Sequence, residues 1–111
     1  VSMAICLLLS LMMPVRADAA RTVGVVMSAN IPYFEKIHEA FLRELKDIGL
    51  ADGTGLSVIV QRPAPDPVAW ANAVRKLIVY DASIIVTYGT PATRVAVDAS
   101  EDIPVVFAAV P

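Results

Sequence analysis

Two short polar segments contain residue types that bind small anions in proteins. One is Ser28-Ala29-Asn30, and the other is Tyr88-Gly89-Thr90-Pro91-Ala92-Thr93. A glycine lets a ligand approach the backbone, Thr90 offers a hydroxyl group and an N-cap, and free N–H groups near Ala92 and Thr93 would present positive potential at a helix start. These features suit a carboxylate. The predicted ligand-binding residues are Ser28, Asn30, Tyr88, Gly89, Thr90, Ala92 and Thr93.

Each of these residues also has an ordinary structural explanation. Thr90-Pro91 is a common way to start a helix, and Gly89 can serve only to make a turn. Ser and Asn are frequent in any loop that joins a strand to a helix. On residue type alone, the binding and the structural interpretations of residues 89–93 stay equally open, so the position of the loop in the fold must separate them.

Patterns of known catalytic sites are missing from the sequence. His38 is the only histidine, and it lies in mid-helix beside the apolar stripe, which favours a structural role. No Ser-His-Asp set or metal-binding cluster can be assembled, and no G-x-G-x-x-G or Walker A sequence offers a phosphate-binding loop. The acidic residues of a phosphoacceptor receiver domain are also missing. We predict no enzymatic activity, no cofactor and no metal site.

The elements that must position these segments alternate between strand and helix. β-Branched runs predict strands at residues 22–28, 56–61, 83–89 and 103–110, and apolar residues at helical spacing predict helices at residues 32–48, 67–81 and 90–99. This alternation is typical of an α/β fold with a parallel sheet. The first strand is apolar almost throughout, which predicts that helices cover both of its faces.

Apolar stripes on the two longer predicted helices would face the sheet. The first stripe is Phe34, Ile37, Phe41, Leu45 and Ile48. The second stripe is Trp70, Val74, Leu77 and Ile78. Gly49 is placed to end the first helix in a left-handed cap, and Asp66 is placed to cap the second helix before Pro67. Because Trp70 falls on the second stripe, we interpret it as a core residue and not as a ligand platform.

The handedness of the connections predicts where the two polar segments lie. Right-handed crossovers are satisfied by a doubly wound sheet of strand order 2-1-3-4, with the first helix on one face and the next two on the other. The winding then reverses between strands one and three. Ligands of open α/β sheets bind at the carboxyl ends of the strands beside such a switch point. Residues 28–30 and 88–93 follow these two strands, which favours the binding interpretation.

Composition limits the partners of the chain. The 111 residues carry a formal net charge of −2, and the 9 lysines and arginines are scattered. Nucleic-acid binding depends on clustered basic residues, so we predict no nucleic-acid partner. A single cysteine excludes an internal disulfide. The length allows one small domain.

The apolar run at residues 3–13 has the length of a signal-peptide core. It is too short to span a bilayer, which takes roughly 20 apolar residues. Ala17-Asp18-Ala19 then provides the small side chains that a signal peptidase accepts. We predict a signal peptide over residues 1–19 and a periplasmic or secreted mature chain, residues 20–111, that does not span the membrane. A buried or membrane-resident helix is the alternative, and the short length of the run argues against it.

Two segments of the mature chain are the most recognisable, IIVTYGTPA at residues 84–92 and DIPVVFAAV at residues 102–110. Together with VGVVMS and the first predicted helix, they resemble the ABC transporter substrate-binding protein family, whose described members include proteins that bind tryptophan and other aromatic amino acids. The resemblance extends over nearly all of the mature chain. The pattern of the first helix is generic and adds little to it.

The resemblance implies a type I periplasmic-binding-protein fold with a Rossmann-like arrangement, in which two lobes close on a small solute and deliver it to a membrane permease. It also implies that residues 89–93 meet the ligand's carboxylate. Family members continue beyond IPVVFAAVP, so we interpret residues 20–111 as the N-terminal part of the first lobe, truncated. The predicted function is the extracytoplasmic solute-binding component of an ABC importer, for an amino acid or similar small carboxylate.

Two other functions use the same arrangement of strands. The effector-binding core of a transcription regulator has this lobe, but it would require a DNA-binding helix-turn-helix in place of the apolar run at residues 3–13. An enzyme with a flavodoxin-like arrangement would require a phosphate or flavin at the loop after the first strand. The transcription regulator is the alternative function.

Overall fold

The computed structural model of the chain describes residues 21–51, 53 and 55–108. Strands and helices alternate through this part of the chain. The elements are β1 (Arg21–Met27), α2 (Pro32–Asp47), β2 (Leu56–Gln61), α3 (Pro67–Val79), β3 (Ile84–Tyr88), α4 (Thr90–Ala99) and β4 (Val105–Ala108). The predicted signal peptide and its cleavage site lie outside the described residues.

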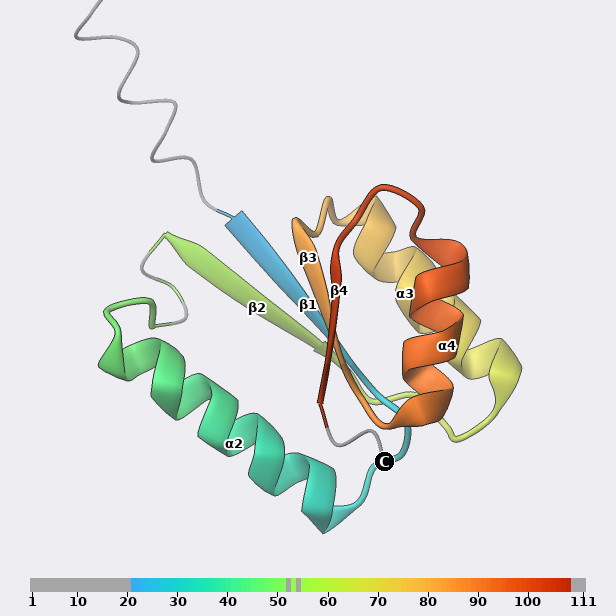
Figure 1. Cartoon of the computed structure of the whole chain (residues 1–111), viewed down its shortest axis with the longest axis horizontal. Helices are drawn as coiled ribbons and strands as arrows, with labels where there is room; N and C mark the ends of the chain where they lie inside the picture. Colours follow the sequence, from blue (N-terminus) through green and yellow to red (C-terminus); the bar gives the residue numbers. More distant parts are fainter. Residues whose placement is uncertain (1–20, 52, 54, 109–111) are drawn as a thin grey trace, which may run out of the picture.

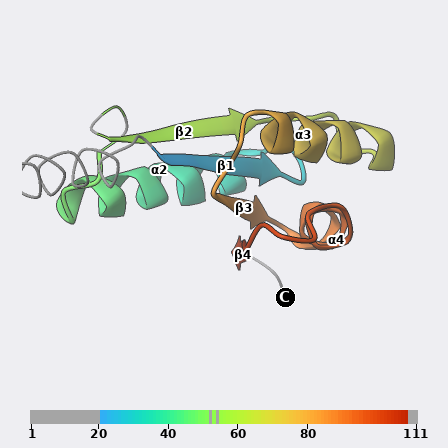
Figure 2. The same ribbon diagram turned by 90° about the horizontal axis from the view of Figure 1, so that it is seen from above.

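The described strands form one parallel sheet in the order β2-β1-β3-β4, as predicted. Helix α2 covers one face of this sheet, while α3 and α4 lie on the other (Figure 1). The view from above shows the strands in this order from β2 to β4, with α3 and α4 to their right (Figure 2). The α/β fold class and its doubly wound sheet are therefore confirmed.

Side chains alternate between two cores, one on each face of the sheet. The core of the α2 face contains Val23, Val25, Met27, Phe34, Val86 and Tyr88. The core of the α3–α4 face contains Val26, Ala73, Val74, Leu77, Ala82, Ile85, Ala92 and Ala96. Both faces of β1 are buried, which explains its unbroken apolar sequence. Gly24 is needed there, because a Cβ atom would lie 2.6 Å from Leu77 Cδ1.

Most predicted ends of helices are close to those of the structure, and two differ for local reasons. Helix α2 ends at Asp47, so Ile48 is the C-cap and is 67% exposed instead of joining the apolar stripe. Gly49 follows at φ +84°, as predicted for a left-handed cap. Helix α3 ends at Val79 and not at Asp81, because Asp81 leaves the helical region with φ 58°.

The start of α3 has the cap that the sequence predicts. Asp66 Oδ1 accepts a hydrogen bond from the Ala69 N–H at 2.8 Å. The last strand, β4, is shorter than predicted, and residues 109–111 lie outside the described part. Val106 and Phe107 of β4 are 48% and 62% exposed. Among the described residues, no helix is both long enough and apolar enough to cross a membrane.

Candidate ligand-binding site

The ends of β1 and β3 lie together at the carboxyl edge of the sheet, where the chain turns into α2 and α4 (Figure 1). The Ser28 N–H donates to the Tyr88 carbonyl oxygen at 2.9 Å, which joins the two strand ends. We call residues 28–30 and 88–93 the candidate edge. The structure brings the two predicted polar segments to one place, at the switch point of the sheet.

Ser28 holds the two halves of the candidate edge together. Its side chain is buried, and its Oγ accepts a hydrogen bond from the Ala92 N–H at 3.0 Å. The N-cap position of α4 is Gly89, so Thr90 is the first helical residue and the prediction that Thr90 is the N-cap is wrong. Because glycine has no side chain to cap with, Ser28, which follows β1, provides the acceptor that an N-cap residue usually provides.

Gly89 makes a turn that other residues would not tolerate. Its φ is +93°, a region that side-chain-bearing residues rarely adopt. A Cβ atom at this position would lie 2.6 Å from Ser28 Oγ and 2.9 Å from Phe34 Cζ. The space beside Gly89 is thus filled by the chain's own side chains, which gives the glycine a structural reason independent of any ligand.

Thr93 is also bonded within the chain. Its Oγ1 donates to the Gly89 carbonyl oxygen at 2.8 Å and lies 2.7 Å from Thr87 Oγ1. Since the hydroxyl hydrogen of Thr93 is used for Gly89, Thr87 must donate in the second contact. The Thr93 N–H donates to the same Gly89 oxygen at 3.3 Å. The expectation that Ala92 and Thr93 offer free N–H groups is therefore wrong, because both amides have acceptors in the chain.

Asn30 and Thr90 offer the open polar groups of the candidate edge. Asn30 is exposed and Thr90 is half-buried. Within the described residues, neither side chain has a hydrogen-bond partner, and the Thr90 N–H has no acceptor. Because Ser28 and Ala92 are buried, these two residues are the ones that a solute at the edge can reach with polar atoms.

Trp70 lies at the candidate edge and not in the core, which corrects its sequence-based interpretation. It is half-buried, and its Nε1 donates to the Ser28 carbonyl oxygen at 2.9 Å. With Thr90, Pro91 and neighbouring side chains it lines an apolar hollow of about 320 Å³. One feature of the sequence could have indicated this position. Trp70 lies in the first turn of α3, directly after the Asp66 N-cap, and a helix that follows a strand of a parallel sheet starts at the carboxyl edge of that sheet.

Tyr88 contributes only its backbone to the candidate edge. Its side chain is 1% exposed, points to the α2 face, and its hydroxyl lies 3.0 Å from Nδ1 of His38. Burial, followed by the nearby Glu35 charge, raises the pKa of Tyr88 to about 12. Burial also lowers the pKa of His38, with a smaller effect of Arg62 in the same direction. The pair agrees with the structural role expected for His38.

An exposed ion pair lies next to this buried pair. Arg62, just after β2, donates from Nε and Nη2 to the two carboxylate oxygens of Glu35 in α2. The hydrogen bond from Arg62 lowers the pKa of Glu35. This two-point contact ties the start of α2 to the end of β2.

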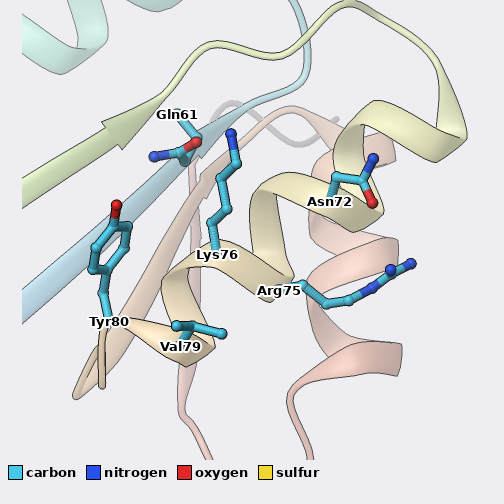
Figure 3. Close-up of a pocket in the computed structure, with 6 residues that line it drawn as sticks. All are labelled: Gln61, Asn72, Arg75, Lys76, Val79 and Tyr80. Atoms are coloured by element: carbon cyan, nitrogen blue, oxygen red, sulfur yellow. The ribbon is translucent and has the colours of Figure 1, made fainter.

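A larger hollow lies away from the candidate edge. It has a volume of about 590 Å³ and is lined by Gln61, Asn72, Arg75, Lys76, Val79 and Tyr80. Figure 3 shows Gln61 and Lys76 pointing toward one another, with Arg75 directed away from them. This hollow is on the flank of β2 and α3. In the part of the chain that the structure describes, no three His, Cys, Asp or Glu side chains form a group that could hold a metal.

Comparison with known proteins gives a family match and several similar structures. The family model described as ABC transporter substrate binding protein matches residues 22–111. A tyrosine-binding protein of Clostridioides difficile is 24% identical over 90 residues, which are 81% of this chain and 26% of that protein. The chain thus spans about a quarter of the length of this relative.

Two solved structures share the fold. One is the ligand-free, open form of a substrate-binding protein with adhesive properties from Clostridium difficile, with a TM-score of 0.77 and 22% identity over 82% of this chain and 31% of that chain. The other, an ABC domain from Streptococcus pneumonia in complex with L-Trp, has a TM-score of 0.76 and 22% identity over 83% of this chain and 31% of that chain. The described part of the chain therefore has the same fold as the matching part of these two structures.

Proposed function

Because the chain belongs to the ABC transporter substrate-binding protein family, we propose that it acts in the solute-binding component of an ABC importer. Its solute would be an amino acid or a similar small carboxylate, and its site would be the candidate edge. The observation that carries the proposal is the family match over residues 22–111. In this function the chain is periplasmic or secreted, delivers its solute to a membrane permease and catalyses no reaction.

The geometry of the candidate edge supports a carboxylate ligand. Asn30 and Thr90 extend from the two loops that the Ser28–Tyr88 hydrogen bond joins. A carboxylate beside them can accept hydrogen bonds from the Asn30 amide, the Thr90 hydroxyl and the Thr90 N–H. The last donor lies in the first turn of α4, where the helix dipole favours negative charge.

The names of similar proteins support an aromatic amino acid as the solute. One relative is called a tyrosine-binding protein, and one similar structure contains L-Trp. The apolar hollow that Trp70 lines next to Thr90 offers an aromatic side chain a place to bury its surface. A carboxylate and an aromatic ring would then be recognised by neighbouring parts of one edge.

The expected affinity is weak for this chain by itself. The chain covers only 26% of the tyrosine-binding protein and 31% of the chain that was solved with L-Trp. A ligand on one open wall keeps much of its surface in water, whereas ligands in clefts are mostly buried. Binding is therefore best measured at millimolar ligand by the chemical shifts of backbone amides.

The test is a titration of the ¹⁵N-labelled chain with L-tryptophan, with tryptamine as the control that lacks only the carboxylate. We expect shifts at Asn30, Thr90 and Thr93 with L-tryptophan and much smaller ones with tryptamine. Asn30→Ala and Thr90→Val should each weaken binding several-fold, while Asn72→Ala, on the flank of α3, should not. Equal shifts with both ligands, or shifts confined to the flank hollow, would reject the proposed site.

A transcription regulator's effector core stays the alternative function, and the family match favours the importer. Genes for a permease and an ATPase beside the coding sequence would support the importer. A coding region for a helix-turn-helix directly upstream would support the regulator instead.

A further inference from the structure

His38 is a buried ionisable residue that the proposed function does not use. It is 4% exposed, although it lies on a surface helix. Its ring centroid is 6.3 Å from that of Phe41 and 5.9 Å from that of Tyr88. Its described hydrogen bond is the one to the Tyr88 hydroxyl, at 3.0 Å. Burying such a group is costly unless it is satisfied, so this contact is a specific feature of the α2 face.

Hydrogen bonds connect His38 with the candidate edge. Tyr88 is the last residue of β3, and its carbonyl oxygen accepts from the Ser28 N–H. Ser28 in turn accepts from the Ala92 N–H through its Oγ and from Trp70 Nε1 through its carbonyl oxygen. A displacement of Tyr88 therefore moves the residue that caps α4 and contacts Trp70. Tyr88 also directly precedes Gly89, whose turn has no room for adjustment.

We propose that His38 is a positioning residue for the candidate edge, that it acts through the Tyr88 hydroxyl, and that it holds this geometry only while its imidazole is neutral. The use of the edge for a solute rests on the proposed function. The geometry of the edge does not, so the inference can be tested without a ligand.

Protonation changes what His38 can do in this contact. A neutral imidazole can accept the Tyr88 O–H at Nδ1, whereas the imidazolium has a hydrogen on both nitrogens and can only donate. The hydrogen bond must then reverse, so that Nδ1–H donates to the Tyr88 oxygen, the Tyr88 O–H loses its acceptor, and a charge lies in a buried site. Both effects loosen the contact between α2 and β3.

Charged groups on each neighbouring element face His38. Arg62, which follows β2, disfavours the imidazolium, while Glu35 and Glu39 of α2 favour it, and the Tyr88 hydroxyl of β3 stays protonated. Burial is the largest influence and lowers the pKa of His38 below its ordinary value of 6.5. The imidazole is thus neutral above pH 6.5, and it gains its proton only as the pH falls below that value.

The hydrogen-bonded residues from His38 through Tyr88 and Ser28 to Trp70 have a spectroscopic reporter at each end, because His38 is the only histidine of the sequence and Trp70 the only tryptophan. The NMR signal of the His38 ring measures its protonation directly, and the fluorescence of Trp70 measures the environment of the edge. In the full chain between about pH 8 and about pH 5, we expect Trp70 emission to shift to longer wavelength with the same midpoint as the His38 signal. That midpoint should lie below pH 6.5.

Variants separate positioning from general packing. His38→Asn places an amide near the position of Nδ1 with similar helix propensity, so it should keep the edge intact and abolish the pH response of Trp70. Tyr88→Phe keeps the ring and removes the hydroxyl, so it should shift Trp70 emission already at pH 7.5. Tyr80→Phe is the matched control, since Tyr80 is 57% exposed and lies at the end of α3.

Two results would overturn the inference. One is Trp70 emission that stays constant while His38 titrates, and the other is a pH response that persists unchanged in His38→Asn. If His38→Asn does not fold, the comparison of the two midpoints in the unmodified chain decides by itself. A failure of L-tryptophan to bind would reject the proposed solute and would leave these ligand-free results unaffected.

Discussion

The two faces of the sheet are built in different ways. The α3–α4 face buries apolar residues, many of them alanines that let the two helices approach the sheet and one another, together with the hydroxyl groups of Thr87 and Ser100, which do not ionise. The α2 face buries Phe34 and the hydrogen-bonded pair of His38 and Tyr88. One face therefore supplies stability that does not depend on pH, and the other places an ionisable pair directly behind the candidate edge.

The variant expected to have the largest effect on stability is Leu77→Ala, on the α3–α4 face. Leu77 is fully buried and lies over Gly24, so its removal leaves a cavity that the backbone of β1 cannot fill. We expect a loss of about 2–5 kcal/mol in the free energy of unfolding, measured with urea. The loss should be the same at pH 7.5 and pH 5.5, because Leu77 belongs to a buried cluster of apolar residues.

Val79→Ala is the control for this change. Val79 is on the same helix but is 81% exposed, so the free energy of unfolding should change by less than about 0.5 kcal/mol. A loss in Leu77→Ala that grew strongly at low pH would contradict the division of roles between the two faces.

The next largest effect is expected at the junction of the two faces, in Gly89→Ala. The backbone of Gly89, with φ 93° and ψ 154°, lies in a region that is essentially restricted to glycine, which costs about 1–3 kcal/mol for a residue with a side chain. The contacts of the new Cβ with Ser28 and Phe34 add overpacking, for a total of about 3 kcal/mol. Circular dichroism during urea unfolding measures this loss, and Trp70 fluorescence should show a disturbed edge.

Gly49→Ala separates the two causes. Gly49 has a similar φ of +84°, but a Cβ atom there would meet nothing within 4 Å. Its substitution should cost only the conformational part, about 1–2 kcal/mol. If both glycine variants lose the same amount, the contacts of Gly89 with Ser28 and Phe34 contribute nothing.

The sequence was sufficient to predict the fold because its signals are periodic and local. The apolar run of β1, the stripe of Val74 and Leu77, and the Asp66 cap each depend on nearby residues, and right-handed crossovers then limit the order of the strands. The meeting of residues 28–30 and 88–93 followed from that order. The packing of the α3–α4 face was thus predictable for Val74 and Leu77, whereas Trp70 of the same predicted stripe lies at the candidate edge.

The details of the candidate edge were not predictable, because they depend on contacts between distant residues. Sequence reasoning assigned Ser28 and the Ala92 amide to a ligand, whereas they bond to one another across 64 positions. The hydrogen-bonded residues His38 and Tyr88 are 50 positions apart in the sequence, and no periodic pattern of residues predicts their contact. Ala92 needed an acceptor in any case, but no local pattern says which side chain provides it.

A smaller effect is expected from pH on the α2 face. The folded protein holds the pKa of His38 below 6.5, while the unfolded chain leaves it near 6.5. The unfolded state therefore binds more protons in the range between these values, so stability is complete above pH 6.5 and decreases as the pH falls below it. Urea unfolding at pH 7.5 and pH 5.5 should show a loss of no more than the order of 1 kcal/mol, the scale of one hydrogen bond. His38→Asn should remove this dependence, and a protein that gained stability on acidification through this range would contradict it.

The smallest effect concerns the exposed Glu35–Arg62 ion pair, which should matter for the pKa of His38 more than for stability. Exposed ion pairs contribute little to folding. The charges act on His38 in opposite directions, since Arg62 lowers its pKa and Glu35 raises it. Glu35→Gln should therefore lower the pKa of His38 further, while Arg62→Gln should raise it, both measured from the NMR signal of the single histidine. Because both variants lose the same ion pair, a shift in the same direction in both would mean that the pair acts by fixing α2 against β2 and not through its charges.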